Sequence, residues 1–383
     1  MNPFKPTAGK MPPILIGREN VLNDFREALI NGAGAPGRIM LLTGQRGYGK
    51  TVLLTQLRKI AQEQQWKTIS DTASTGLTER MLAALTQPST QIHASLSPSV
   101  NLAGLGTVSI GEASVSKERA ALDLREALLA AIQSKHIKKG KGLLITIDET
   151  QAISEQDLVN IATAVQHVIT TLDEQNIADE EKKGIALVFA GLPRMVNELT
   201  NNRVTTFLRR ALRRELHSVA IPDVKNAYIQ SVRESGKEIS QSCALQAAEL
   251  SGGYPYMIQL VGYYMWQAAQ TEGSAEITAQ HLKIGTADAL LAFDDAVCEP
   301  ILHELTASER QLLEAIAQVS RPQEAGATVA RLVAQTGRSR SWVNKYRMSL
   351  LAQNVIESPE RGVLRISVPH LSDFLVKRSG KAV

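Results

Sequence analysis

The sequence predicts an α/β core with a mainly parallel sheet, followed by an all-helical segment and a C-terminal segment of helices and a hairpin. Short apolar runs alternate with amphipathic helical patterns over residues 1–219. Residues 220–297 lack any convincing strand pattern, and three helical patterns precede two β-like runs in residues 298–383. These observations predict three domains with those boundaries.

The core pattern consists of four apolar runs and the helical patterns around them. Strands are expected at Ile39–Thr43, Trp66–Ser70, Leu143–Ile147 and Ile185–Ala190. Helices are expected at Val21–Ile30, Lys50–Gln64, Glu79–Thr86, Glu118–Ser134 and Glu155–Leu172. Because buried strands separated by helices form parallel sheets, we expect helices on both faces of this sheet. Residues 87–117, rich in Ser, Thr, Gly and Ala, form an insertion that permits either a β-hairpin or a flexible loop.

The later domains are predicted to be mostly helical. Lid helices are expected at Asp223–Ser235, Gln241–Ser251, Pro255–Thr271 and Ala279–Asp294. In the last domain, helices are expected at Ala307–Gln318, Thr328–Gln335 and Ser339–Gln353, and strands at Val355–Ser358 and Val363–Val368. Three helices and a hairpin in this order predict a winged helix-turn-helix.

Composition excludes several classes of protein. The chain has 383 residues, 44% hydrophobic and 21% charged, which is typical of a globular protein. No apolar run is long enough for a membrane span, and no signal peptide is evident. Cys243 and Cys298 lie in no metal-binding or disulfide pattern. We therefore expect a cytoplasmic protein that has no membrane partner.

A glycine-rich loop follows the first predicted strand and precedes a helical run. Its pattern, Gly-x-x-x-x-Gly-Lys-Thr, lets main-chain N–H groups turn toward phosphate at the start of a helix. Lys50 is expected to reach the β- and γ-phosphates, and Thr51 to bind Mg²⁺. Nucleotide contacts are expected from Gly44, Gln45, Arg46, Gly47, Tyr48, Gly49, Lys50, Thr51 and Val52.

Two carboxylates end the third predicted strand. Asp148 and Glu149 follow a buried apolar run, so they are expected at the strand edge where ligands bind in open α/β sheets. Asp148 is expected to hold Mg²⁺ with Thr51, and Glu149 to activate the attacking water. The pair predicts a P-loop NTPase that hydrolyses ATP, since no Asn-Lys-x-Asp sequence for guanine is present.

The segment Ile14-Leu15-Ile16-Gly17-Arg18-Glu19-Asn20 resembles a box shared by AAA+ ATPases of three groups. These are replication initiators of the origin-recognition type, archaeal-type ATPases and STAND signalling ATPases. The resemblance implies that Ile16 and Arg18 contact adenosine. The segment Ser251–Gln259 resembles the sensor-2 region of these families, which implies that Pro255 and Tyr256 lie near the nucleotide. It lacks the arginine frequent in initiators, and Gly191-Leu192-Pro193 lacks the usual polar first sensor, so hydrolysis is expected to be slow.

The segment Asn201–Glu215 resembles the arginine-finger region of the same families. An arginine finger stabilises charge on the phosphate bound by a neighbouring subunit. Arg209 and Arg210 match best, and Arg203 and Arg213 are alternatives. The resemblance implies a homo-oligomer in the ATP state; the other interpretation is a basic surface helix.

The final domain carries most of the positive charge. Residues 301–383 have a net charge of +5, against −1 for the rest of the chain. Candidate DNA contacts on the second helix of the motif and on the hairpin are Arg338, Arg340, Ser341, Asn344, Lys345, Arg347 and Arg361. The opposite face of that helix, with Trp342, Val343, Met348 and Leu351, is expected to join the core.

Together these features predict an ATP-binding AAA+ ATPase that assembles with nucleotide and binds double-stranded DNA, similar to replication initiators or mobile-element regulators. The alternative is a STAND-like signalling or defence switch that binds protein partners, in which the winged helix restrains the nucleotide state.

Overall fold

The computed structural model describes residues 1–7, 10–12, 14–32, 34–86, 113–193, 199, 206–320 and 326–380. The chain forms two compact units. The core unit comprises residues 18–43 and 50–215, and the C-terminal unit comprises residues 1–17, 44–49 and 216–383.

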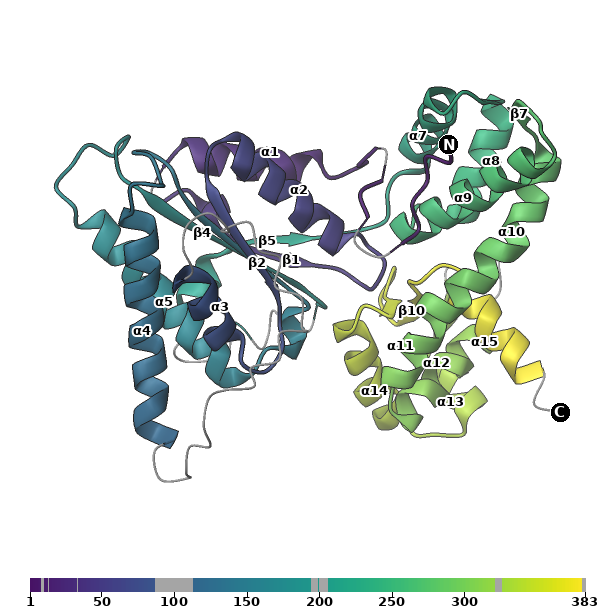
Figure 1. Ribbon diagram of the computed structural model, residues 1–383. Coiled ribbons are helices and arrows are strands. Elements are labelled where there is room, and N and C mark those ends of the chain that lie inside the picture. The colour runs from purple at the N-terminus through teal and green to yellow at the C-terminus, as the bar shows by residue number, and fades with distance from the viewer. Residues whose placement is uncertain are drawn as a thin grey trace. The chain divides into compact units, whose positions relative to one another are not determined.

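A five-stranded parallel sheet forms the centre of the core unit (Figure 1). Its order is β2-β3-β4-β1-β5. The strands are β1 (Ile39–Thr43), β2 (Lys67–Thr72), β3 (Gly142–Asp148), β4 (Gly184–Gly191) and β5 (Leu212–Glu215). Four of them lie where the apolar runs predict strands. The fifth, Leu-Arg-Arg-Glu, pairs with β1 at the edge of the sheet, where its arginines escape burial.

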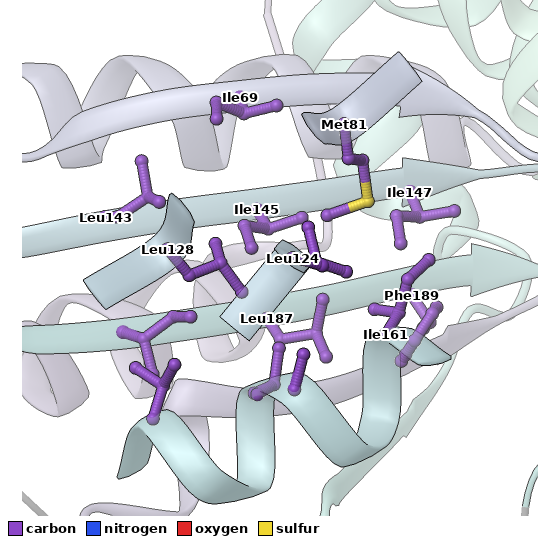
Figure 2. Packing of buried hydrophobic residues seen from close by; sticks show 14 of the residues in the cluster. Ile69, Met81, Leu124, Leu128, Leu143, Ile145, Ile147, Ile161, Leu187 and Phe189 are labelled. Atoms are coloured by element: carbon purple, nitrogen blue, oxygen red, sulfur yellow. The ribbon is translucent and has the colours of Figure 1, made fainter. Parts of the chain in front are cut away.

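Helices cover both faces of this sheet (Figure 1). The bounds are α1 (Glu19–Ile30), α2 (Lys50–Glu63), α3 (Leu77–Thr86), α4 (Ala113–Gln133) and α5 (Glu155–Asp173). Alternate residues of β3 and β4 point into one cluster with α3, α4 and α5, as Figure 2 shows for Ile145, Leu187 and Leu128. Each fully buried Leu or Ile stabilises the fold by about 1.5–3 kcal/mol relative to exposure. Within the expected insertion, residues 113–117 belong to α4, and residues 87–112 lie outside the described residues.

The lid segment of the C-terminal unit contains α7 (Ile221–Glu234), α8 (Gln241–Ser251), α9 (Pro255–Thr271) and α10 (Ala279–Phe293). The prediction that this segment has no strand is wrong in one detail. Two short strands, β6 (Glu238–Ile239) and β7 (Glu276–Ile277), pair in parallel, and two-residue strands leave no detectable alternation in sequence. The N-terminal residues pack on α9: Phe4 is buried, and a Cβ at Gly262 would lie 2.4 Å from its ring.

The last part of this unit combines helices with a small antiparallel sheet. After a π-helical turn (Asp294–Cys298) come α11 (Glu299–Glu304), α12 (Ala307–Val319), α13 (Val329–Thr336), α14 (Arg340–Ala352) and α15 (Leu371–Gly380). Strands β8 (Ala327–Thr328), β9 (Ile356–Glu357) and β10 (Val363–Ile366) form a sheet in the order β8-β10-β9. The three helices and the hairpin lie at their predicted positions, whereas α11, β8 and α15 are additional.

The inward face of α14 differs from the prediction. Val343 and Leu350 are fully buried, but Met348 is 61% exposed and does not join the core. Five residues along an α-helix turn the side chain by about 500°, so Met348 lies about 140° away from Val343. Trp342 and Leu351 are only partly buried.

A buried carboxylate joins α12 to α14. Glu309 accepts hydrogen bonds from the backbone N–H (2.8 Å) and hydroxyl (2.7 Å) of Thr306, from Ser349 and from the Gln353 amide (3.1 Å). Burial opposes ionisation of Glu309, but the hydrogen bonds from Ser349 and Thr306 outweigh it and lower the pKa below its ordinary value. The ionised form of Glu309 therefore stabilises the packing of α14.

We expect Glu309→Gln to lower the free energy of unfolding at neutral pH by about 1–3 kcal/mol, because charged hydrogen bonds are lost. Since the folded pKa is depressed, this stabilisation is present above the unfolded pKa and is lost as pH falls through the folded value. Urea unfolding at neutral and acidic pH would measure it, with the exposed Glu360→Gln as control. An unchanged difference between parent and variant in acid would contradict the assignment.

Candidate functional site

The glycine-rich loop connects β1 to α2 at the carboxyl edge of the sheet. Gly47 (φ 76°) and Gly49 (φ 82°) adopt the left-handed conformation that glycine accepts without steric cost. Helix α2 begins at Lys50, so its first turn follows the loop directly. The Lys50 side chain is 7% exposed. Thr51 is exposed, and Val52 is partly buried. The N-terminal end of an α-helix favours a bound anion.

Thr51 and Asp148 meet in the core unit although 97 positions separate them in the chain. The Thr51 hydroxyl donates to Asp148 Oδ2 at 2.5 Å, and the N–H of Glu149 donates to Oδ1 at 2.9 Å. Burial raises the pKa of Asp148, while the hydrogen bond from Thr51 and the charge of Lys50 act in the opposite direction. Because burial disfavours the ionised form of Asp148, a bound cation would stabilise that form.

The donor set fits a magnesium ion. Mg²⁺ bound with nucleotide keeps several waters and takes one or two protein oxygens as well as phosphate oxygens. The Thr51 hydroxyl and the Asp148 carboxylate supply such oxygens side by side.

Glu149 occupies the left-handed region, with φ 49° and ψ 38°. This conformation is unfavourable for a non-glycine residue and is frequent at functional sites. The Gln151 side chain donates to Glu149 Oε2, and its own oxygen accepts from the N–H of Leu192 at 3.0 Å. Gln151 thus holds Glu149 beside the end of β4, where the sequence lacks the usual polar residue.

Arg58 lies on α2 about two turns after Thr51 and, like Lys50, interacts with the charge of Asp148. Its guanidinium donates to the hydroxyls of Thr146 (3.2 Å) and Thr55 (2.9 Å). Burial lowers the pKa of Arg58, and the charge of Asp148 opposes that effect. Neither Gln151 nor Arg58 was a sequence candidate, because a lone amide or arginine carries no motif.

The first half of the glycine-rich loop contacts the lid inside the C-terminal unit. The Tyr254 hydroxyl donates to the carbonyl of Arg46, and the N–H of Tyr256 donates to the carbonyl of Gly47 at 3.1 Å. A Cβ at Gly47 would lie 2.7 Å from the Tyr254 ring. Tyr256 was a sequence candidate. Tyr254, fully buried, was missed because an aromatic residue at a helix start is also typical of a core.

Two side chains of the loop reach the last part of the same unit. The Gln45 amide donates to the main-chain carbonyl of Gln353, just after α14. Arg46 forms an ion pair with Glu304 at the end of α11. The loop therefore has partners on α9, on α11 and beside α14.

The remaining nucleotide candidates lie on both units. Ile16 is a partly buried residue of the C-terminal unit, and Arg18, 7% exposed, precedes α1 in the core unit. Pro255 starts α9, and the neighbouring Tyr48 ring packs edge-on against Tyr254, 4.6 Å between centroids. Gly44 is closely approached by Leu216 and Tyr48.

The candidate finger arginines lie far from Asp148 in their own core unit. Arg209 and Arg210 are exposed in a 3₁₀ turn (Thr206–Arg210) that precedes β5. Because β5 is parallel to β1, this turn lies at the amino edge of the sheet, opposite the edge with Asp148. At about 3.3 Å per residue, β5 alone separates the two edges by roughly 13 Å. Arg213 is exposed on β5, and Arg203 lies outside the described residues.

The candidate DNA contacts gather around α14. Ser339 caps this helix by accepting from the N–H of Trp342 at 3.2 Å. The exposed candidates are Arg338, Arg340, Ser341, Asn344, Lys345 and Arg361, the last in the turn between β9 and β10. Arg347 is partly buried, and its Nε is enclosed without a hydrogen-bond partner. It is therefore the least accessible of the candidates.

Two segments of the chain match known protein families. Residues 14–180 match the AAA ATPase domain family, and residues 295–375 match a domain of unknown function (DUF8462). No curated protein sequence matches the chain significantly. The chain thus contains a segment of the AAA ATPase type, which covers the glycine-rich loop and both carboxylates.

Solved structures resemble the whole chain at low sequence identity. The ORC2 protein of Aeropyrum pernix, in its ADPNP–ADP complexes, is 13% identical with a TM-score of 0.63, and 98% of each chain is covered. A Walker-type ATPase of Pyrococcus abyssi is 15% identical with a TM-score of 0.60, covering 94% of this chain and 96% of its own. These likenesses confirm the predicted fold class, an α/β P-loop NTPase core followed by a helical C-terminal region. Among the described residues, no helix has the length and apolar character of a membrane span.

Proposed function

We propose that this protein is a cytoplasmic AAA+ ATPase that assembles when it binds ATP and that binds double-stranded DNA through a C-terminal winged helix. The observation that carries the proposal is the contact of Thr51 with Asp148 directly after the glycine-rich loop. It joins the two motifs that a magnesium–triphosphate needs. The proposed domains are the core 1–219, the lid 220–297 and the winged helix 298–383.

Each residue of the site has a proposed role in hydrolysis. Main-chain groups of residues 44–51 and the Lys50 ammonium bind the phosphates. Mg²⁺, held by Thr51 and Asp148, supplies charge neutralisation at the phosphates when it is bound. Glu149 orients and deprotonates the attacking water, and Gln151 keeps its carboxylate in place. Ile16, Arg18, Pro255 and Tyr256 are the proposed contacts to the rest of the nucleotide.

Assembly is proposed to bring Arg209 or Arg210 to the phosphate of a neighbouring subunit. Their place at the amino edge of the sheet, opposite the edge with Asp148, supports action on a neighbouring subunit rather than within the same core unit. From that edge an exposed guanidinium would act on the phosphate of a second copy of the chain, where it would stabilise charge in the transition state.

Mixing two inactive variants tests this arrangement. We expect Arg209→Ala/Arg210→Ala subunits and Glu149→Gln subunits each to lack ATPase activity, and their mixture to regain part of it. A mixed interface in which the Glu149→Gln subunit supplies the finger and the other subunit supplies Glu149 joins an intact finger to an intact base. Light scattering would measure the ATP-dependent particle mass in parallel. No activity in the mixture, with assembly intact, would show that these arginines do not act between subunits.

The DNA-binding part of the proposal rests on the arrangement of α13, α14 and the β9–β10 hairpin. These elements have the order of a winged helix, in which α14 would enter the major groove and the hairpin would meet the backbone. Arg340, Ser341, Asn344 and Lys345 are exposed on α14. Arg361 occupies the tip of the hairpin.

We expect Arg340→Ala/Lys345→Ala to weaken binding to a random duplex and to flatten its salt dependence, because fewer counterions are released. Fluorescence anisotropy over a series of salt concentrations measures both quantities. Lys283→Ala/Arg233→Ala removes two exposed charges from the lid and serves as the control. Equal salt slopes for the parent and the α14 variant would contradict a contact at this helix.

One observation favours the alternative, a STAND-like switch with protein partners. Contacts of Gln45 with Gln353 and of Arg46 with Glu304 join the glycine-rich loop to the last domain, as expected where a winged helix restrains the nucleotide state. ATP-dependent mass determination with and without duplex DNA distinguishes the two functions. Growth of the particle with both supports the initiator-like function, and no duplex binding at low salt supports the switch.

A further inference from the structure

Helix α14 carries two aromatic rings that are not buried in the hydrophobic core of the domain. Trp342 and Tyr346 lie one turn apart, with ring centroids 4.9 Å from each other. Both are only partly buried, whereas Val343 and Leu350 fill the core beneath the helix.

Two cations accompany these rings. The Arg338 guanidinium lies over Trp342, 5.7 Å from the ring centroid, and the Lys345 ammonium lies over Tyr346 at 5.3 Å. Both cations are exposed, so they can exchange the ring for another partner. Arg338, Trp342, Lys345 and Tyr346 together form what we call the stacking surface.

Contacts with a regular duplex do not explain the rings of the stacking surface. Paired bases already stack on their neighbours and present only their edges in the grooves, where hydrogen-bonding and small apolar side chains read them. An aromatic ring stacks on the face of a base, and such a face is accessible where bases are unpaired. Alternating rings and cations are what single-strand binding requires, because the rings take bases while the cations take phosphates.

We propose that the stacking surface binds unpaired bases of a single-stranded nucleic acid. Trp342 and Tyr346 stack on successive bases, and Arg338 and Lys345 neutralise the phosphates that flank them. The inference rests on the proposed function, since it assigns to the same helix a second form of nucleic acid. The inference adds that α14 binds a nucleic-acid strand whose bases are unpaired.

The tryptophan content of the chain allows a direct test. Trp66 and Trp266 are 2% and 7% exposed, so Trp342 is the accessible one of the three. A short oligothymidylate is expected to quench the fluorescence of Trp342. An abasic oligomer of equal length has the same phosphates without bases, and it is expected to quench much less. A duplex of equal length reports on groove binding.

Anisotropy of a labelled oligothymidylate measures the affinity of variants. Trp342→Leu is expected to weaken binding roughly tenfold, while Trp342→Phe keeps most of the affinity because a ring face remains. Tyr346→Leu is expected to act in the same direction. Met348→Leu, which changes an exposed apolar side chain of the same helix, is the matched control. Thermal melting of each variant shows whether the helix has been lost.

The outcomes separate this inference from the proposed function. Equal affinity for the oligothymidylate and the abasic oligomer would overturn the inference, because the bases then contribute nothing. Duplex binding without single-strand binding would overturn it too and leave the proposed function in place. Absence of binding to every nucleic acid would remove both.

Discussion

Lys50→Ala is expected to abolish ATP binding, with a loss of affinity of at least roughly a hundredfold, because charge-assisted contacts to the phosphates disappear. The side chain is almost fully buried beside Asp148, so no exposed lysine can replace it. Fluorescence of a labelled ATP analogue, or calorimetry, measures the effect.

The control for this variant is Lys59→Ala, which removes an exposed ammonium from the same helix and is expected to bind ATP like the parent. Thermal melting without nucleotide separates loss of binding from loss of fold. Binding of the analogue by Lys50→Ala with parental affinity would remove the phosphate site from this loop, and with it the proposed ATPase.

Glu149→Gln is expected to preserve ATP binding and to slow hydrolysis by roughly two to four orders of magnitude, the usual contribution of a general base. Glutamine has the size of glutamate and can still accept the hydrogen bond from Gln151, so the local geometry is retained. Only the ability to take a proton from water is lost. Phosphate release, measured at saturating ATP, reports the rate.

Glu180→Gln, an exposed change on the same unit, is the control for this rate. If Glu149→Gln released phosphate as fast as the parent, the base would have to be another group. Tight ATP binding without turnover is the expected combination, and it would also provide a stable ATP state for assembly experiments.

The three central strands, β1, β3 and β4, were predictable because each is buried on both faces and therefore reads as an apolar run. The edge strand β2 was found from the shorter run that begins at Trp66. Strand β5 was not, because this edge strand carries Arg213, which is exposed, and Arg214, which is partly buried, and so contains no apolar run. The Arg214 guanidinium bonds Asp24 of α1 at 2.7 Å, a contact between residues far apart in the chain. Met348 was assigned to the wrong face because its apolar character suggested burial, whereas its position along α14 decides its direction.

The two motifs of the nucleotide site were predictable because each is local. The structure places Thr51 beside Asp148, as the motifs imply. Gln151 and Tyr254 could not be found in this way, because their roles depend on partners that only the folded chain brings near. Leu192 lies 41 positions from Gln151, and Arg46 lies 208 positions from Tyr254.

Gln353 links the glycine-rich loop to α14 within the C-terminal unit. The Gln353 carbonyl accepts a hydrogen bond from the Gln45 side chain, and the Gln353 side-chain amide donates one to Glu309. Glu309 also accepts a hydrogen bond from the Ser349 hydroxyl on α14. A ligand that draws the Gln45 side chain toward itself would break its hydrogen bond to the peptide that closes α14. If a ligand of the loop changes the affinity of α14 for nucleic acid in this way, nucleic acid bound to α14 changes the affinity of the loop for its ligand by the same factor, because binding free energies are reciprocal.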